Sequence, residues 1–481
     1  MLLSELPCEG MTKALRVGLL GCGNVGGALA HLLVDDAGRI AARTGMELQV
    51  VAVAVRSLSR ERDAPVPPDV FTTDATAVVS DPEVDIVVEV IGGIEPARTL
   101  ILTALKAGKP VVTANKELLA NCGSELFEAA SMAGVDLLFE AAVAGAIPLI
   151  RPLRESLAGE RIGRVMGIVN GTTNFILTRM SEGGASYHDA LAEAQSLGYA
   201  ERDPTADVEG FDAAAKAAIL ANVAFGARVV AGDVYREGIS GITSLDIDVA
   251  HKLGYTVKLL AVVEHTDAEG DEQETVAVRV HPAMIPATHP LASVRDSFNA
   301  VFVEGDAVGQ LMFLGRGAGG MPTASAVLGD LLDAAHDLST GGLGRTVTLR
   351  RTAIRPIDDL RSAYYLTLDV VDRPGVLHAV SGVLGRHQVS IQLMEQEVLP
   401  VLHPYGLAGG TFTAPGVHGP VDSLAATEAA IRGRGVGDDS SARLVFVTHP
   451  AYERDMQACL GELRHLDVVH QIGGLLRVIG P

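Results

Sequence analysis

The sequence predicts an α/β fold, and three features of its 481 residues lead to that prediction. Continuous apolar runs near the N-terminus, of which LQVVAVAV at 48–55 is one, alternate with segments of helical periodicity, as in a parallel sheet that helices cover on both faces. A glycine-rich turn joins the first apolar run to the helix after it. Near the C-terminus, strand-like and helix-like segments alternate again after the Gly/Arg-rich passage at 340–351, which marks a domain boundary.

The first element, LRVGLL at 15–20, leads into GCGNVG and a helical pattern, and further apolar runs follow at 84–92 and 110–115. In such a strand–turn–helix unit, the glycines allow a tight turn and a close approach of the backbone to a pyrophosphate. We therefore predict a Rossmann-type NAD(P)-binding domain at 14–145; the alternative is a glycine-rich turn in an unrelated α/β fold. The cofactor contacts expected in this turn are Gly21, Gly23 and Gly26.

The end of the second apolar run bears on the choice of cofactor. Sites for NAD usually carry Asp or Glu there, whereas this run ends in Val55-Arg56-Ser57, with Arg60 nearby. A guanidinium suits a 2′-phosphate. We therefore expect Arg56 to bind that phosphate and NADP(H) to be preferred, with NAD(H) also possible; the alternative is that Arg56 is only a solvated strand-end residue.

Lys116 directly follows the predicted strand at 110–115, at the carboxyl edge where ligands bind in open α/β sheets. A lysine at this edge can hold the cofactor or polarise a substrate oxygen. The alternative is a surface lysine at the start of the next helix.

Residues 146–345 mix predicted helices at 187–197 and 210–226 with predicted strands. This mixture indicates an α+β domain that follows the first domain without a linker, and we assign substrate binding, catalysis and dimerisation to it. The predicted strands cover 161–169, 256–264 and 274–281.

The stretch ERDPTADVEGFDAAAK at 201–216 concentrates carboxylates and ends in a lysine. Its helical pattern starts beside Glu209, so this residue, Asp212 and Lys216 are expected on one helix face. Carboxylates can bind the ammonium group of an amino acid, and a lysine among them can protonate an alkoxide or accept a hydroxyl proton. The alternative is a capped helix with an ordinary Asp–Lys pair, which would contribute about 0.3–0.5 kcal/mol.

The motif NGTTNF at 170–175 is similar to a stretch of the phosphorylating aldehyde dehydrogenases, in which a cysteine nucleophile precedes Thr-Thr-Asn. This chain has Gly171 at that place, so no thioester can form there. Direct hydride transfer with a proton donor is the chemistry that remains for a nicotinamide enzyme. The alternative is a polar turn that caps the next helix.

The C-terminal segment at 362–481 predicts a βαββαβ module. Residues 364–395 read as strand, Pro-Gly turn, helix and strand, and apolar runs at 442–450 and 468–479 flank a further helix. Between the two halves lies 397–441, which is rich in Gly, Pro and Ala and only weakly periodic. We interpret it as an inserted, largely disordered loop.

Composition excludes several classes of protein. Hydrophobic residues make up 48% and charged residues 20%, as in globular proteins, and no run of about 18 uncharged apolar residues predicts a membrane span. The net charge of −21 argues against a nucleic-acid partner and an anionic membrane surface. The four cysteines form no CxxC pair, which favours a reducing cytoplasm. Residues 1–13 are expected to be an N-terminal tail without the basic region of a signal peptide.

Together these motifs closely resemble homoserine dehydrogenase of the longer form with a C-terminal ACT domain. The resemblance covers about residues 14–396 and resumes at 442, and it includes VGLLGCGNVG, VVTANKELLA, MGIVNGTTNFIL, LGYAERDPTADVEGFDAAAKAAILA and GRGAGGMPTASAVLGD. It implies NAD(P)-dependent interconversion of L-homoserine and L-aspartate 4-semialdehyde, in threonine, methionine and isoleucine biosynthesis. It also implies a homodimer or homotetramer, and inhibition by threonine through the ACT domain, whose typical turn is DRPGVL at 372–377.

The resemblance also implies roles for particular residues. Lys216 would donate and accept the proton at the substrate oxygen, and Lys116 would assist beside the nicotinamide. The substrate-binding residues would be Gly198, Glu201, Asp207 and Asp212. The cofactor would also touch Asn24, Val25, Arg56, Lys116 and Gly317.

The stretch FEAAVAGAI at 139–147 resembles the monovalent-cation loop of the same family. The resemblance implies a sodium ion held largely by backbone carbonyls, whose hard oxygen atoms suit an alkali ion. The residues alone would indicate only an Ala-rich strand-to-helix turn. The implied ligands are Glu140, Val143, Gly145 and Ile147.

Two other functions remain as alternatives. A non-catalytic, NADP-sensing regulator of amino-acid metabolism would keep the nucleotide-binding and ACT parts, and turnover of homoserine would eliminate it. A phosphorylating semialdehyde dehydrogenase is the alternative among enzymes, and phosphate-independent activity would eliminate it.

Overall fold

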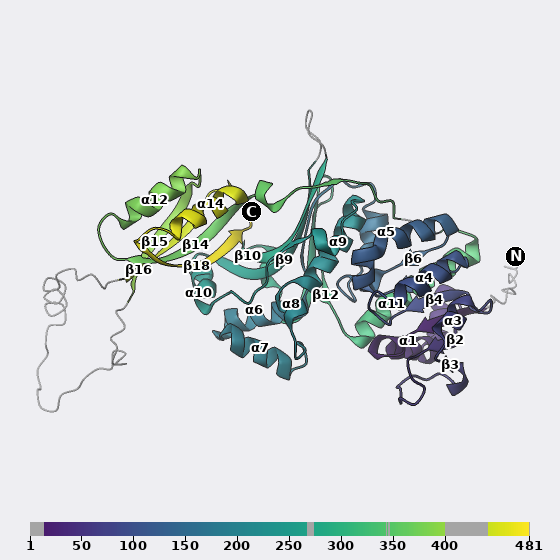
Figure 1. The fold of residues 1–481 in the computed structure, drawn as a ribbon. Helices are drawn as coiled ribbons and strands as arrows, with labels where there is room; N and C mark the ends of the chain where they lie inside the picture. The colour runs from purple at the N-terminus through teal and green to yellow at the C-terminus, as the bar shows by residue number, and fades with distance from the viewer. Residues whose placement is uncertain (1–13, 267–273, 343, 345–346, 400–440, 481) are drawn as a thin grey trace, which may run out of the picture. The chain divides into compact units, whose positions relative to one another are not determined.

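The computed structural model describes residues 14–266, 274–342, 344, 347–399 and 441–480 (Figure 1). The chain divides into two compact units, the first ending at Pro356 and the second beginning at Ile357. The first unit contains both the predicted nucleotide-binding domain and the predicted α+β domain. Within the described residues, no helix is long and apolar enough to cross a lipid bilayer.

The nucleotide-binding part is built on a six-stranded parallel sheet in the order β3-β2-β1-β4-β5-β6. Strands β2 and β3 extend the sheet on one side of β1, and the chain then returns to the other side of β1, where β4 pairs with it. The strand order reverses at this point, and in such sheets dinucleotides bind in the crevice at the carboxyl ends of the two strands. The strands are β1 Leu15–Leu20, β2 Leu48–Ala54, β3 Phe71–Thr72, β4 Ile86–Glu89, β5 Val111–Thr113 and β6 Leu137–Leu138. The helices are α1 Asn24–Asp35, α2 Ala37–Thr44, α3 Ala75–Ser80, α4 Ala97–Lys106, α5 Lys116–Ala133 and α11 Gly320–Thr340.

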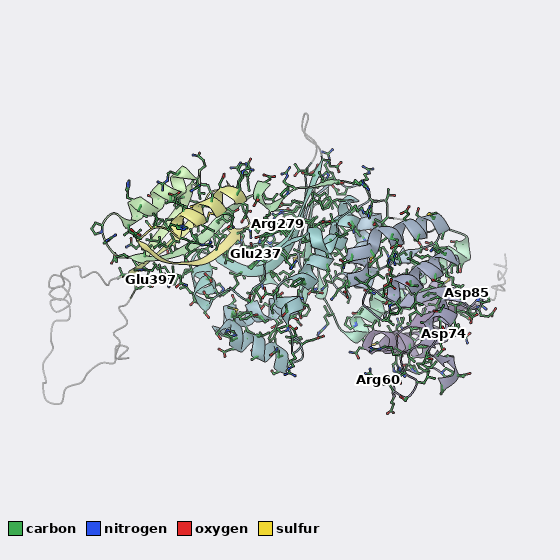
Figure 2. The ribbon with its side chains drawn as sticks, in the orientation of Figure 1. Arg60, Asp74, Asp85, Glu237, Arg279 and Glu397 are labelled. Carbon is green, nitrogen blue, oxygen red and sulfur yellow. The ribbon has the colours of Figure 1, made fainter. Side chains whose placement is uncertain are left out.

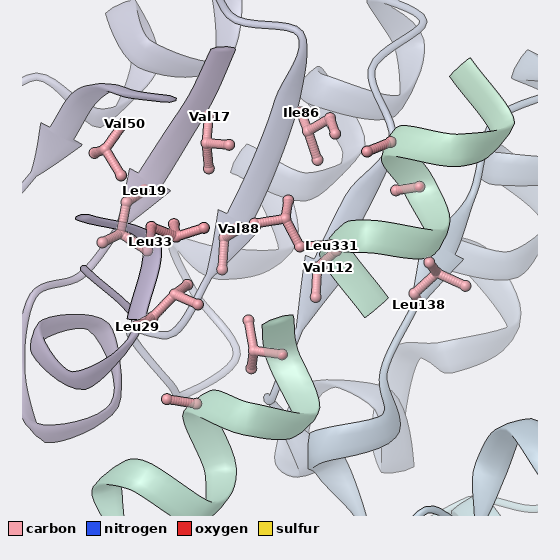
Figure 3. Close-up of a cluster of buried hydrophobic side chains, with 14 of the residues drawn as sticks. Val17, Leu19, Leu29, Leu33, Val50, Ile86, Val88, Val112, Leu138 and Leu331 are labelled. Carbon is pink, nitrogen blue, oxygen red and sulfur yellow. The ribbon is translucent and has the colours of Figure 1, made fainter. Parts of the chain in front are cut away.

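The core of this part shows why the apolar runs form strands. Branched side chains such as Val17 and Ile86 stand on the sheet and pack against Leu29 and Leu33 of α1 (Figure 3). Leu331 of α11 joins the same core, so α1 and α11 lie side by side on one face (Figures 1 and 3). A helix beyond the predicted range of 14–145 therefore completes the nucleotide-binding part.

The α+β part has an antiparallel sheet in the order β12-β11-β7-β9-β10. Helices α6 and α9 lie against its strands β9 and β10, and the two short strands β8 and β13 pair with β10. The strands are β7 Ile162–Ile168, β8 Tyr235–Arg236, β9 Tyr255–Thr266, β10 Thr275–Pro286, β11 Phe298–Gly305, β12 Gly309–Arg316 and β13 Ala353–Ile354. The helices are α6 Gly171–Gly183, α7 Tyr187–Ser196, α8 Thr205–Val208, α9 Phe211–Phe225 and α10 Ser244–Lys252.

Short helical turns connect these elements. They are η1 Pro68–Val70, η2 Glu140–Ala142, η3 Pro152–Ser156, η4 Ala231–Asp233, η5 Pro290–Ser293 and, in the second unit, η6 Ile357–Asp359. The predicted helices and strands of 146–345 are all present, because each apolar run was bounded by glycine or polar residues that end the element.

The second unit confirms the predicted βαββαβ module. Its antiparallel sheet has the order β18-β14-β16-β15, and the side chains of α12 and α14 bury their apolar faces in one core with it. Its elements are β14 Arg361–Val371, α12 Val376–Arg386, β15 Ile391–Leu399, β16 Ser441–Thr448, β17 Ala451–Tyr452, α14 Glu453–Leu463 and β18 Val469–Val478.

The structure corrects the ends of the predicted insertion at 397–441. Glu397 pairs with Arg443 and Leu399 pairs with Ser441, so both ends of the segment belong to the β15–β16 ladder. The sequence misled here because charged and small residues on an edge strand give little apolar alternation. The rest of the predicted insertion, 400–440, lies outside the described residues, as does the predicted tail at 1–13.

Candidate active site

The glycine-rich turn between β1 and α1 has the geometry that a pyrophosphate requires. Gly21 has φ +101°, and a Cβ on it would lie 2.9 Å from the carbonyl oxygen of Val90. A Cβ on Gly26 would lie 2.2 Å from the carbonyl oxygen of Gly21. A Cβ on Gly23 would meet no atom within 4 Å, so packing within the protein does not require a glycine at this position. A ligand that approaches the backbone closely would require one. Asn24 and Val25 form the first turn of α1, at the positive end of its dipole.

A cavity of about 710 Å³ opens beside this turn. Exposed Arg56 and Arg60 line it after the end of β2, together with the half-buried Arg62. Arg60 is labelled in Figure 2. The Arg62 guanidinium donates hydrogen bonds to the carbonyl oxygens of Ser57 and Arg60, so it holds the loop that carries the other two arginines. Three permanent positive charges at this edge fit the phosphates of a dinucleotide.

Sequence reasoning missed Arg62 in this cluster. The only signal was the third arginine in RSLSRER, and a count of basic residues does not reveal that a guanidinium braces a loop. The contribution of Arg62 depends on the fold of the 57–62 loop, which brings its guanidinium back to the backbone.

The buried carboxylate of Glu89 holds together the ends of β4 and β5 at the crevice. Glu89 ends β4 and is fully buried; it accepts hydrogen bonds from the backbone of Ile91 (2.9 Å) and from the Thr113 hydroxyl (2.6 Å). Asn115 caps α5, because its Oδ1 accepts a hydrogen bond from Leu118 N, and its Nδ2 donates to the carbonyl oxygen of Gly93. These contacts fix the start of α5, and Lys116 is its first residue.

The predicted catalytic residues of the two parts meet at one carboxylate. Asp212, in the first turn of α9, forms an ion pair with Lys116 from α5 and accepts a hydrogen bond from Lys216 Nζ at 2.7 Å. Lys216 Nζ also donates to the carbonyl oxygen of Val169 at 2.6 Å. Asp212 and Lys216 are buried, whereas the side chain of Lys116 is 46% exposed, so one member of the cluster remains open to a ligand.

Asp207 and Asn170 complete the cluster. Asn170 precedes α6 and donates from Nδ2 to Asp207 Oδ1 at 2.7 Å and to Asp212 Oδ2 at 2.9 Å. Sequence reasoning treated Asn170 only as part of a motif and assigned it no role in the site. The contact could not be seen because 42 positions of sequence separate Asn170 from Asp212.

The charges of the cluster shift the pKa values of its members in different directions. Burial alone would raise the pKa of Asp212, but the charges of Lys216 and Lys116 outweigh it and hold that pKa below its usual range. Burial lowers the pKa of Lys216. The pKa of Lys116 is raised, because the carboxylate of Asp212 outweighs the effect of burial. Burial raises the pKa of Asp207, and such opposed shifts in one cleft are typical of acid–base sites.

Two predicted members of the acidic stretch make no hydrogen bond or ion pair with this cluster in the part of the chain that the structure describes. Glu201 is exposed on the loop after α7, and its backbone carbonyl accepts a hydrogen bond from Gln195 Nε2 at 3.0 Å. The predicted shared face of Glu209 with Lys216 is wrong. Gly210 has φ +79° and ends α8 before α9 begins, and Glu209 lies against Gly238. Gly198 also has positive φ (+76°) and ends the turn after α7.

The predicted cation loop packs against the predicted cofactor residue Gly317. A Cβ on Gly145 would lie 2.4 Å from the Gly317 carbonyl oxygen, and Ala144 and Gly145 have φ of +57° and +56°. Val143 and Ile147 are buried in the same loop. In the part of the chain that the structure describes, the carbonyl oxygens of Val143 and Gly145 accept no backbone hydrogen bond, which fits a cation held by carbonyls.

The carboxylate of Glu140 is already engaged. It accepts hydrogen bonds from the backbone N–H groups of Leu149 (2.5 Å), Ile150 (2.7 Å) and Arg151 (2.9 Å). The backbone N–H of Glu140 donates to Asp330 of α11, and burial raises the pKa of Asp330 to about 7. Glu140 therefore has only its carbonyl to offer a cation. No group of three or more His, Cys, Asp or Glu side chains suited to a metal occurs among the described residues.

Comparison with known proteins finds relatives over nearly the whole chain. The family model for homoserine dehydrogenase matches residues 148–332, that for its NAD-binding domain matches 21–140, and the ACT domain model matches 364–401. The chain is 47% identical to homoserine dehydrogenase of Mycobacterium tuberculosis over 473 residues, which covers 98% of this chain and 99% of the relative. It is 46% identical to the Corynebacterium glutamicum enzyme, over 98% of this chain and 97% of the relative.

Solved structures agree. Homoserine dehydrogenase from Thiobacillus denitrificans has a TM-score of 0.82 and 39% identity, covering 97% of this chain and 98% of that one. A hyperthermophilic archaeal homoserine dehydrogenase mutant in complex with NADPH has a TM-score of 0.56 and 31% identity, covering 68% of this chain and 98% of that one.

Proposed function

The chain belongs to the homoserine dehydrogenase family of oxidoreductases, and on that premise we propose that it interconverts L-homoserine and L-aspartate 4-semialdehyde with NADP(H). The observation that carries the proposal is the meeting of Lys116 and Lys216 at Asp212, beside the crevice that suits a dinucleotide. The bound nicotinamide would supply acceptance and donation of the hydride. The protein must then move one proton at the substrate oxygen.

Lys216 is the proposed proton carrier. Burial lowers its pKa, so its ammonium group can release and regain a proton more readily than an exposed lysine. During oxidation of the alcohol, the neutral amine accepts the hydroxyl proton as the C–H hydride leaves; during reduction, the ammonium donates that proton to the carbonyl oxygen. Asp212 and the carbonyl of Val169 hold Nζ in place for both directions.

Lys116 and the carboxylates complete the proposed substrate site. Lys116 is half-exposed and keeps its charge through Asp212, which suits electrostatic stabilisation of the substrate oxygen as it gains negative charge. Glu201 is proposed to bind the ammonium group of homoserine from the exposed loop that starts at Gly198, and Asp207 to support the pocket.

The arginine-lined end of the cavity supports a preference for NADP(H). Arg56 and Arg60 offer a 2′-phosphate two exposed guanidinium groups on a loop that Arg62 braces, whereas no carboxylate ends β2 to bind ribose hydroxyls. The archaeal relative was solved with NADPH. Asn24, Val25 and Gly317 are proposed to complete the cofactor contacts.

A structural sodium ion is proposed at the carbonyls of the cation loop. Four backbone oxygens, from Glu140, Val143, Gly145 and Ile147, would give it hard ligands without a net charge. Replacing sodium with choline in the buffer should lower the melting temperature, and an unchanged melting temperature would argue against the ion.

The ACT unit supports proposals about regulation and assembly. Gly375 in the DRPGVL turn has φ +93° and leads into α12, and we propose that this unit binds threonine as a feedback inhibitor.

We also propose a homodimer or homotetramer, supported by exposed apolar Phe298 and Leu314 on neighbouring strands. A cytoplasmic place in threonine, methionine and isoleucine biosynthesis is proposed, supported by the free thiols among the described residues.

The test is homoserine-dependent reduction of NADP⁺ and NAD⁺, measured in parallel with and without threonine. We expect turnover that needs no phosphate, is faster with NADP⁺ and is suppressed by threonine. Failure with both cofactors would refute the enzyme and favour the sensor alternative. The phosphorylating alternative is disfavoured, because a Cβ on Gly171 would lie 2.7 Å from the Ser297 carbonyl oxygen and leaves no room for a cysteine.

A further inference from the structure

Among the described residues, Asn170 is the one neutral side chain that joins both aspartates of the active-site cluster. Its Nδ2 group donates to Asp207 Oδ1 at 2.7 Å and to Asp212 Oδ2 at 2.9 Å, and the residue is 4% exposed. The acceptor on Asp212 is the oxygen that also binds Lys216 Nζ. Asn170 therefore shares one oxygen of the lysine's own counter-ion with Lys216.

The orientation of the Asn170 amide is fixed by its other partners. Its Oδ1 accepts hydrogen bonds from Thr173 N at 2.9 Å and from Thr173 Oγ1 at 3.0 Å, which caps α6. A flipped amide would turn its oxygen toward two carboxylates and its NH₂ toward the Thr173 N–H. One orientation therefore satisfies every partner, and the amide is a rigid link between the end of the helix and the acids.

The start of α6 is held from behind by a second polar group. Asn174 donates from Nδ2 to the carbonyl oxygen of Asp296 at 2.9 Å and accepts from the buried Lys258 Nζ at 2.9 Å. Gly171 packs so closely on Ser297 that a side chain there would clash. These contacts prevent α6 from sliding, so the position of Asn170 is imposed by the fold.

The amide also opposes the electrostatic strain of two neighbouring acids. Burial raises the pKa of Asp207, whereas the hydrogen bond from Asn170 lowers it; the charge of Asp212 raises it, and the charges of Lys216 and Lys116 lower it. Without the donor, Asp207 would bind a proton more readily and its contact with the cluster would change.

We propose that Asn170 is a positioning residue that holds Asp207 and Asp212 side by side as carboxylates, and thereby fixes Lys216 for proton transfer. This inference rests on the proposed oxidation of homoserine. Neither the fold nor the motif requires it, because a serine would cap α6 equally well.

Two variants separate capping from bridging. Asn170→Ser keeps a cap acceptor, but its single hydroxyl proton cannot serve two carboxylates. We expect kcat/KM for homoserine to fall roughly 10- to 100-fold, the effect of losing hydrogen bonds to charged groups, and the acid limb of the pH profile to move to higher pH. Asn170→Asp should lose more at neutral pH, because it adds a third carboxylate. Its activity relative to wild type should recover as pH falls, since a protonated carboxyl can donate again.

The controls identify a merely structural effect. Ser186→Ala removes the cap of α7, whose Oγ accepts from Asp189 N, and should leave the shape of the pH profile unchanged. If Asn170→Ser loses activity with the wild-type pH profile, or keeps both activity and profile, the inference is overturned. Circular dichroism of each variant confirms that it is folded.

A readout without turnover separates this inference from the proposed function. Carbon-13 NMR of labelled aspartate carboxyls should show one buried carboxyl titrating at higher pH in Asn170→Ser than in the wild-type chain. If the wild-type chain fails to oxidise homoserine, the proposed function fails, and the titration alone decides the inference. Identical carboxyl titrations in both proteins would overturn it.

Discussion

Each unit of the chain has a buried carboxylate that is bound by cationic side chains, but the two carboxylates suit different roles, one in catalysis and one in stability. Asp212 in the first unit forms an ion pair with Lys116 and accepts hydrogen bonds from Lys216 and Asn170. Glu453 in the second unit accepts from Arg477 Nε and from the Tyr364 hydroxyl, both at 2.9 Å. Each acid is nearly inaccessible to solvent, so burial alone does not tell a catalytic cluster from a structural one.

The difference lies in the cations and in their exposure. Arg477 cannot lose its proton and is 3% exposed, as is its partner Glu453. Lysines can lose a proton, and Lys116 is 46% exposed. The Glu453 cluster is therefore closed and permanently charged, which suits a fixed fold. The Asp212 cluster is open on one side and able to exchange a proton, which suits catalysis.

The largest effect should come from making the first cluster resemble the second. Lys216→Arg keeps the positive charge near Asp212 but cannot release a proton at working pH. We expect kcat for homoserine oxidation to fall roughly 100- to 10,000-fold, the range for general acid–base groups. Steady-state kinetics would test this, with the exposed Lys106→Arg as control. Near-normal turnover would mean that charge alone is needed at this position.

Breaking the second cluster should cost stability and spare catalysis. Glu453→Gln removes the buried carboxylate that Arg477 binds, and breaking a buried ion pair typically costs about 3–5 kcal/mol. Urea unfolding should show that loss, and the double variant Glu453→Gln/Arg477→Met should recover part of it. Turnover without threonine should change little below the melting temperature, because every assigned catalytic residue lies in the first unit. A loss under about 1 kcal/mol, the size of a surface ion pair, would contradict the comparison.

A third group of charges, the arginines of the cavity beside the glycine-rich turn, tests the comparison at an exposed site. Arg56→Ala should weaken NADPH binding roughly 10- to 100-fold, because a charged hydrogen bond to phosphate is lost. NADH binding should change little. Fluorescence titration with both cofactors measures the ratio, and the exposed Arg43→Ala is the matched control. Equal weakening of both cofactors would remove the 2′-phosphate argument.

The smallest effect is expected at His31, where a half-buried histidine binds two acids. Its ring contacts Asp35 at 2.9 Å and Asp63 at 3.0 Å, and the hydrogen bonds with these carboxylates raise its pKa. The protonated ring therefore contributes stability below its ordinary pKa, and the contribution is lost as pH rises through the raised value. His31→Gln should flatten this slight dependence of the melting temperature on pH. An unchanged slope would show that the contact is inert.

The fold was largely readable because its signals are local. Apolar runs ended by glycine, such as the one before Gly21, predict strands and turns without any knowledge of their partners. Whether α11 would pack on the sheet of β1 was not readable, because an amphipathic helix does not specify which apolar surface it covers. The edge strand β15 was misread in part, since an edge strand needs no apolar alternation.

The site was readable only where chemistry and chain position coincide. Lys216 and Asp212 are four residues apart on one helix, so their contact follows from helix geometry. The contacts of Lys116 and Asn170 join distant segments and depend on tertiary folding. The prediction that Glu209 shares a helix face with Lys216 failed because Gly210, in the left-handed conformation, separates Glu209 from α9. The φ angle of a glycine cannot be read from the sequence.

One paired measurement decides whether Lys216 exchanges a proton with the substrate oxygen during homoserine oxidation. Homoserine-dependent reduction of NADP⁺ is compared between the wild-type chain and Lys216→Ala, with NADPH binding measured on the same samples. We expect turnover by the wild-type chain, and a roughly 100- to 10,000-fold lower kcat in the variant with unchanged NADPH affinity. Wild-type kcat in Lys216→Ala would contradict this expectation.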